Sequence, residues 1–182
     1  MKNSTGHYGY LTITLHWLVA IIVFGLFALG FWMVDLTYYD AWYKSGPALH
    51  KSIGISLLII MLFRVFWRVK QTNPDALPTH SNFEKKVGHS VHILLYGLLF
   101  LIMTSGYLIS TADDRGIDVF NLFTVPGFGS FIENQEDVAG VIHQYLAYSM
   151  MVLVFLHAVA ALKHHFVDKD ITLKRMLGLR SK

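Results

Sequence analysis

The chain has 182 residues, of which 54% are hydrophobic and only 15% are charged, and its formal net charge is +3. Soluble domains carry about 25% charged residues, so this composition argues against a soluble enzyme, a disordered chain or a protein with a nucleic-acid partner. The chain contains no cysteine, which excludes disulfides, thiolate metal sites, iron–sulfur clusters and cofactors attached through cysteine. Ten histidines in so apolar a chain are the unusual feature.

Long apolar runs predict four membrane spans. Three of these contain at least 25 consecutive residues without Asp, Glu, Lys or Arg, and a helix needs about 20 apolar residues to cross a bilayer. The remaining span carries Lys51 and Arg64 near its ends, from where long side chains can reach the membrane surface. The expected spans are about 9–34, 47–68, 85–111 and 138–164. We therefore expect a single all-α domain over residues 1–182, an integral membrane four-helix bundle.

The distribution of Lys and Arg predicts how the bundle is oriented. Four spans place the N-terminus, residues 64–86 and the C-terminal tail on one side, and that side holds 12 of the 15 Lys and Arg residues. Basic residues favour the cytoplasmic side of a membrane, so we expect both termini to be cytoplasmic. The outer side keeps only Lys44, Lys51 and Arg115, beside eight acidic residues.

Four histidines within the predicted spans fall at two matched depths. His16 and His157 each lie about two turns from the cytoplasmic end of a span, and His50 and His143 each lie about one turn from the outer face. His143 and His157 are 14 residues apart, which in a helix gives a rise of about 21 Å with the two side chains on nearly one face. The last span thus offers an imidazole to each of two stacked sites. Bis-histidine ligation of haem b suits this plan, and we expect the bundle to enclose two b-type haems.

Other interpretations of these histidines remain open. They could be scattered and hydrogen-bonded without a cofactor. Gly54 and Gly140, close to two of the histidines, leave room for a macrocycle but would equally suit helix–helix contact. A zinc site would need three or four converging ligands, which two pairs at opposite depths do not supply. A proton channel or transporter usually places Asp or Glu inside a span, and none lies in the middle of a span here.

Several short motifs occur together and in order along the chain. They are His16-Trp17, His50-Lys51-Ser52-Ile53-Gly54, Arg64-Val65-Phe66-Trp67-Arg68, and His143 and His157 followed by an Ala-rich run to His164-His165. Taken together, these motifs resemble the bacterial di-haem cytochrome b-561 family over nearly the whole chain. The resemblance implies a multi-pass protein of the bacterial inner membrane whose axial haem ligands are His16, His157, His50 and His143.

The resemblance also implies a function in electron transfer with the quinone pool. One branch of the family oxidises superoxide and passes the electrons to ubiquinone. We therefore expect a membrane-bound di-haem b cytochrome that carries electrons between a periplasmic one-electron donor, such as superoxide, and ubiquinone as a bound substrate. The alternative is a haem b membrane subunit of a larger dehydrogenase or hydrogenase complex, working beside a soluble redox partner. In either case the lipid bilayer surrounds the protein.

Basic residues at the cytoplasmic surface are candidates for a quinone site. Reduction of a quinone consumes two protons, and histidine titrates near neutrality. Lys70 and His164 are the first candidates to bind the quinone or relay protons, and His165 and Arg68 are the second. Arg64 is expected at the same surface. The competing interpretation is that these side chains only satisfy the positive-inside bias and contact anionic lipid.

The remaining candidates lie on both sides of the membrane. Lys51 and Arg115 on the acidic outer side are candidates to attract an anion or to pair with haem propionates. His89 and His92, three residues apart, are expected near the inner haem, a quinone carbonyl or lipid headgroups. His80 is expected to be exposed.

Overall fold

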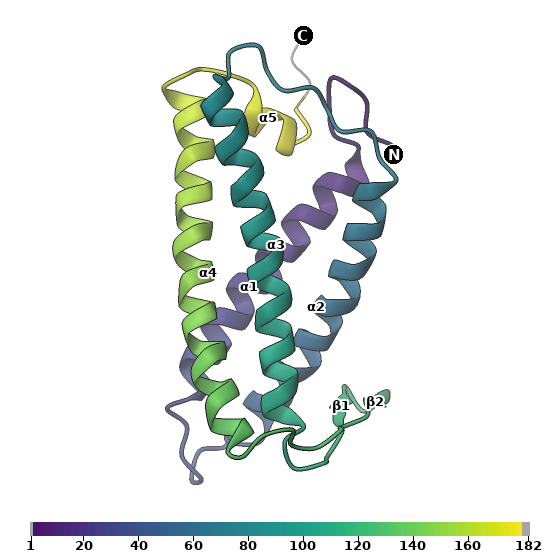
Figure 1. Cartoon of the computed structure of the whole chain (residues 1–182), viewed down its shortest axis with the longest axis vertical. Coiled ribbons are helices and arrows are strands. Elements are labelled where there is room, and N and C mark those ends of the chain that lie inside the picture. The colour runs from purple at the N-terminus through teal and green to yellow at the C-terminus, as the bar shows by residue number, and fades with distance from the viewer. Residues whose placement is uncertain (1, 180–182) are drawn as a thin grey trace.

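The computed structural model describes residues 2–179. Within this range four long helices form a bundle (Figure 1). They are α1 (Tyr10–Met33), α2 (Ser45–Val69), α3 (Asn82–Ser110) and α4 (Gln135–Phe166). All four are long and apolar enough to cross a membrane, which confirms the predicted helical membrane bundle.

A short helix lies at one end of the bundle and a short β-hairpin at the other. A short helix, α5 (Thr172–Met176), lies at the end that also holds the start of α1 and the connection from α2 to α3 (Figure 1). At the opposite end, strands β1 (Ile117–Val119) and β2 (Phe123–Val125) form an antiparallel hairpin within the connection from α3 to α4. We call these the α5 end and the hairpin end. The sequence predicted the long connection but not the hairpin inside it.

Indole hydrogen bonds tie the elements together at the α5 end. Trp17 of α1 donates from Nε1 to the carbonyl of Met176 at 2.8 Å, which fixes α5 against the first helix. Trp67 of α2 donates from Nε1 to the Thr12 hydroxyl at 3.2 Å. Both tryptophans belong to the motifs found in the sequence, and their polar atoms have the partners that such side chains usually find.

Local sequence explains where α3 and α4 begin. Ser81 and Glu84 form a capping box, in which the Ser81 hydroxyl accepts from the Glu84 amide at 3.2 Å and Glu84 Oε2 accepts from the Ser81 amide at 2.9 Å. This satisfies amides that have no partner within the first turn of the helix. In the first turn of α4, Gln135 donates to the carbonyl of Leu108 at 3.0 Å and accepts from the Phe131 amide at 2.8 Å, which joins α3 and α4 at the hairpin end.

An apolar core fills the middle of the bundle. Its most buried members come from all four long helices and are Val19, Leu57, Met61, Leu99 and Met150. Met150 lies seven residues from both His143 and His157, or about 10 Å of helical rise. The core therefore separates the two levels at which these histidines lie. The outward surface is also apolar, with Ile21 68% and Phe155 66% exposed, as expected of side chains that face lipid.

Candidate functional site

His50 of α2 and His143 of α4 face one another at the hairpin end. Their ring centroids are 6.2 Å apart and their planes are inclined by 70°. A cavity of about 400 Å³ adjoins both rings and is lined by side chains from all four long helices. This volume lies in the range of cofactor pockets, about 300–1,000 Å³. Gly54 lines the cavity, and a Cβ atom built there meets no atom within 4 Å.

The hydrogen bonds of His143 define which ring nitrogen can bind a metal. His143 Nδ1 lies 3.0 Å from the carbonyl oxygen of Ile102. Because a carbonyl only accepts hydrogen bonds, Nδ1 carries the hydrogen, and Nε2 of the neutral ring keeps a free lone pair. The Ser105 hydroxyl lies 3.1 Å from the same nitrogen. Nδ1 of His50, by contrast, is buried without a hydrogen-bond partner among the described residues.

Two glycines on neighbouring helices support these imidazoles. A Cβ atom at Gly30 of α1 would lie 3.1 Å from His50 Cε1, and one at Gly106 of α3 would lie 3.1 Å from His143 Cε1. Contacts of 3.1 Å are shorter than ordinary van der Waals contacts of a Cβ atom. Each imidazole ring therefore packs directly on the backbone of the adjacent helix. Neither glycine was predicted from the sequence, because each contact joins residues that are far apart in the chain.

His16 of α1 and His157 of α4 form a second facing pair, nearer the α5 end. Their ring centroids are 6.4 Å apart and their planes are inclined by 62°. His92 of α3 adjoins the pair, with its ring centroid 5.3 Å from that of His157. His89 lies on the same helix and is exposed, whereas the His92 ring contacts the pair.

Arg64 lies inside the bundle beside this second pair. Its Nη2 atom is 3.2 Å from His16 Nδ1, and its guanidinium also covers the Tyr96 ring, 5.4 Å from the centroid. The expectation that Arg64 belongs to the surface cluster is therefore wrong. The guanidinium reaches the imidazole of His16 on α1, a contact that sequence spacing alone did not indicate.

Both pairs have the spacing that two axial ligands need. Because a bond from imidazole nitrogen to a metal is about 2.1 Å and a ring nitrogen lies about 1.1 Å from its centroid, two in-line axial imidazoles have centroids about 6.4 Å apart. The cavity and the free Nε2 of His143 also fit a haem between His50 and His143.

At the second pair a guanidinium only donates, so His16 Nδ1 accepts and the proton resides on Nε2. Arg64 must leave Nδ1 before His16 can ligate, and a carboxylate such as a haem propionate is a suitable alternative partner.

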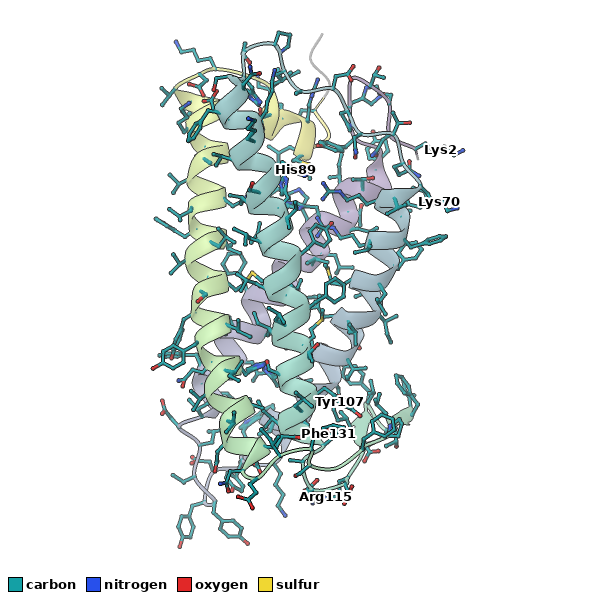
Figure 2. The ribbon with its side chains drawn as sticks, viewed as in Figure 1. Lys2, Lys70, His89, Tyr107, Arg115 and Phe131 are labelled. Carbon is teal, nitrogen blue, oxygen red and sulfur yellow. The ribbon has the colours of Figure 1, made fainter. Side chains whose placement is uncertain are left out.

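The candidate quinone residues are spread over the α5 end. The Arg68 guanidinium lies 5.4 Å from the centroid of the Tyr96 ring, which it shares with Arg64. Lys70 is exposed at the end of α2 (Figure 2). No hydrogen bond or ion pair between residues 2 and 179 joins Lys70 to His164. The structure thus places Arg68 beside Tyr96, on the ring that Arg64 also covers, but does not bring the two first candidates together.

The histidines near the end of α4 have different surroundings. His164 Nδ1 lies 2.8 Å from Asp168 Oδ2, whereas the ring of His165 packs against Phe166 at a centroid distance of 4.8 Å. The side chain of His80 is only 17% exposed and lies 2.9 Å from Asp170 Oδ2. The expectation that His80 is exposed is wrong, because the turn after α4 brings a carboxylate against it.

The two candidate cations at the hairpin end differ in their partners. Lys51 and Arg115 both line the cavity beside His50 and His143. Arg115 donates from Nε to Asp113 Oδ2 at 2.6 Å, and this hydrogen bond lowers the pKa of the Asp113 carboxyl, so the two charges offset one another. Lys51 is exposed and forms no ion pair with any residue in the range 2–179. It is the cation at this cavity that has no ion-pair partner among the described residues, although Glu136 also lines the cavity.

Four apolar helices around two levels of facing histidines are the architecture of a membrane haem cytochrome. The model of the family described as prokaryotic cytochrome b561 matches residues 7–179, and the chain belongs to this family. The chain is accordingly a multi-pass membrane protein that binds haem b and transfers electrons. This confirms the family resemblance found in the sequence.

Three relatives are similar along almost their whole length. The chain is 51% identical to cytochrome b561 homolog 2 of Escherichia coli (strain K12), over 98% of this chain and 95% of that protein. It is 31% identical to cytochrome b562 of Cereibacter sphaeroides, over 95% of this chain and 96% of the relative. It is 29% identical to the probable superoxide oxidase CybB of Yersinia pestis, over 93% of this chain and 95% of that protein.

Proposed function

We propose that the chain is a single four-span domain holding two b haems, one between His50 and His143 and the other between His16 and His157. The observation that carries this proposal is the spacing of the two imidazole pairs, 6.2 and 6.4 Å between ring centroids. One helix, α4, supplies a ligand to both haems, and α1 and α2 each supply one. The apolar core between the pairs keeps the haems at separate levels.

The proposed orientation has the α5 end in the cytoplasm and the hairpin end in the periplasm of a bacterial inner membrane. It is supported by the sequence segments at the α5 end, which carry most of the Lys and Arg residues, as the positive-inside rule requires. In this orientation the pair His50–His143 ligates the outer haem and the pair His16–His157 the inner haem. Both termini are then cytoplasmic.

The proposed reaction moves electrons from superoxide, at the periplasmic end, to ubiquinone at the cytoplasmic end. Two superoxide anions each give up one electron and become O₂. The two electrons and two cytoplasmic protons convert one ubiquinone to ubiquinol. Support comes from the similarity to a protein named probable superoxide oxidase and from Lys51, a cation at the outer cavity that has no ion-pair partner among the described residues. A positive charge at such a cavity raises the local concentration of an anion.

The quinone is proposed to bind near the inner pair, where Arg68 is the best-placed of the candidate residues. Arg68 shares the Tyr96 ring with Arg64, and Arg64 contacts His16. Lys70, His164 and His165 lie at the same end of the bundle but contact other residues. We expect Arg68→Gln to slow ubiquinone reduction more than the double variant Lys70→Ala, His164→Ala. If the double variant slowed the reaction more than Arg68→Gln, the quinone site would lie nearer to α5.

Reconstitution of the haem-loaded protein into liposomes tests the proposed reaction. Superoxide pulses supplied outside should reduce the haems, and ubiquinone in the bilayer should reoxidise them with one ubiquinol formed per two superoxide anions. Liposomes without ubiquinone are the control, in which the haems should remain reduced. Haem reduction without ubiquinol formation would contradict the quinone assignment. Reduction by a soluble one-electron protein donor but not by superoxide would contradict the donor assignment.

A further inference from the structure

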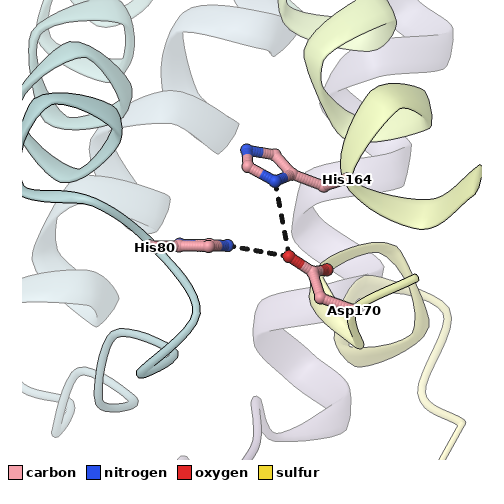
Figure 3. Close-up of side chains that lie close together, drawn as sticks. All are labelled: His80, His164 and Asp170. Carbon is pink, nitrogen blue, oxygen red and sulfur yellow. Dashed lines mark hydrogen bonds and ion pairs between the residues drawn. The ribbon is translucent and has the colours of Figure 1, made fainter. Parts of the chain in front are cut away.

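Two histidines and an aspartate converge at the α5 end, outside both proposed haem sites (Figure 3). His80 precedes α3, His164 lies in the last turn of α4, and Asp170 follows that helix. Asp170 Oδ2 lies 2.9 Å from His80 Nε2 and 3.3 Å from His164 Nδ1. The Asp170 side chain is only 3% exposed, so this is an enclosed cluster rather than a chance approach of surface groups.

The backbone after α4 holds this arrangement in place. The Asp170 amide donates to the carbonyl of His164 at 3.0 Å, which turns the chain back beneath that histidine. Lys169, between them, adopts a left-handed φ of 55°. The other carboxylate oxygen, Asp170 Oδ1, accepts from the Thr172 amide at 2.8 Å. Oδ2 is thereby left facing the two imidazoles.

His164 Nδ1 is in an unusual position for a hydrogen-bonding group. It lies 2.8 Å from Asp168 Oδ2 and 3.3 Å from Asp170 Oδ2, yet it is buried without a partner in hydrogen-bond geometry. The separation of 3.3 Å between His164 Nδ1 and Asp170 Oδ2, not aligned along an N–H direction, suits two ligands of a common cation. Tetrahedral zinc with bonds of about 2.1 Å has neighbouring ligand atoms about 3.4 Å apart.

The charge around the cluster also suits a divalent cation. Lys163 Nζ lies 2.9 Å from Glu84 Oε1 and 2.8 Å from Asp168 Oδ2, so one ammonium is shared by two carboxylates. With Asp170, this network contains three carboxylates and one lysine, a formal charge of −2 when the histidines are neutral. The ammonium already bound to Glu84 and Asp168 makes Asp170 the carboxylate most available to an ion.

We propose that His80, His164 and Asp170, whose ligand atoms all lie within 4.8 Å of one another, bind a divalent transition-metal ion of the zinc type, with solvent completing the coordination. Imidazole and carboxylate ligands favour such an ion over magnesium or calcium, which prefer oxygen alone. Bound metal would tie the connection between α2 and α3 to the segment after α4. The metal would also occupy Nδ1 of His164, which is a candidate residue of the quinone site. The metal site itself does not depend on the proposed quinone reaction.

Zinc titration of the haem-loaded full chain in detergent, followed by calorimetry, tests the site. We expect one saturable Zn²⁺ per chain and no comparable heat from Mg²⁺. His80→Gln and Asp170→Asn should each weaken Zn²⁺ binding by about tenfold or more, since even residues that only support a metal ligand are worth about 10–100-fold in affinity. His7→Gln removes an exposed histidine at the same end and should leave the affinity unchanged. Absence of saturable binding, or equal binding by all variants, would overturn the proposal.

X-ray absorption at the zinc edge gives a measurement that does not rely on any variant folding. The zinc-loaded wild-type protein should show a four-coordinate shell with scattering from two imidazole rings. A shell of oxygen atoms alone, or one with a single imidazole, would overturn the site even if the calorimetric stoichiometry were one.

Discussion

His143 and Ile102 are joined by a hydrogen bond in which the imidazole can only be the donor. This bond fixes the proton on Nδ1 and leaves Nε2 free, so His143 already has the tautomer that can bind iron through Nε2. At the inner pair the contact between Arg64 and His16 has the opposite polarity. The two proposed haem sites therefore differ: His143 needs no change of tautomer to bind iron, whereas binding by His16 displaces Arg64.

Gly106→Ala is expected to weaken haem binding at the outer pair. The added methyl would lie 3.1 Å from His143 Cε1 and 3.4 Å from Nδ1, and overpacking of this kind costs about 1–3 kcal/mol. The loss of haem to an excess of apomyoglobin, followed by absorption, should become faster for one of the two haems. Gly97→Ala on the same helix, where a Cβ meets no atom within 4 Å, is the matched control. Equal rates in both variants would show that His143 does not hold a haem beside Gly106.

Arg64→Gln should lower the midpoint potential of the inner haem. A nearby positive charge favours the reduced iron, and its loss at a distance of about 10 Å with an effective dielectric constant near 20 corresponds to about 70 mV. Spectroelectrochemical titration resolves the two haems, and Lys70→Gln, which changes an exposed cation at the same end, should leave both potentials unchanged. A shift confined to the outer haem would show that Arg64 does not lie beside the inner haem.

Charge changes at the outer cavity should alter the rate of haem reduction by superoxide. Lys51→Glu should slow this rate about three- to tenfold at low salt, and less at high salt, because it reverses the charge of a cation at the cavity that has no ion-pair partner. Asp113→Asn should have the opposite effect, since it releases Arg115 from its ion pair. Stopped-flow absorption at two ionic strengths measures both. Rates that respond to neither substitution nor salt would argue against an anionic donor at this cavity.

Ser52→Ala should loosen the hairpin from α2. The Ser52 hydroxyl donates to the carbonyl of Asp118 and accepts from the amide of Phe120, each at 3.2 Å. Its loss leaves buried polar groups unpaired, at about 1–3 kcal/mol each. Hydrogen exchange of the hairpin amides should accelerate. Ser56→Ala, one turn along, removes only a hydroxyl bonded to the carbonyl of Ser52 and should leave the exchange unchanged. If both variants accelerated the exchange equally, the Ser52 hydroxyl would not be what holds the hairpin against α2.

The helices and the facing histidines could be predicted from the sequence because both depend on short-range periodicity. Apolar runs predict membrane helices, and the 14-residue separation of His143 and His157 places them on one face. The structure brings His157 opposite His16, and His143 opposite His50, as the depth argument required. What those imidazoles ligate stays a proposal, but their juxtaposition followed from helix geometry alone.

The supporting residues could not be predicted, because their roles depend on contacts between helices. Gly30 and Gly106 look like any other glycines of the spans until the rotation of each helix is known. Arg64 could equally have reached the membrane surface, and only the position of α1 shows that His16 is its partner. The partial burial of His80 depends on Asp170, which lies 90 residues away in the chain.

The central claim, two haems with the stated ligand pairs, is tested most directly by reduced-minus-oxidised spectra of four single variants, His16→Ala, His157→Ala, His50→Ala and His143→Ala. The wild type should contain two haem b per chain by the pyridine haemochrome assay. His50→Ala and His143→Ala should lose the same spectral component, and His16→Ala and His157→Ala the other. Loss of one shared component in His16→Ala and His143→Ala, or a single haem in the wild type, would contradict the account.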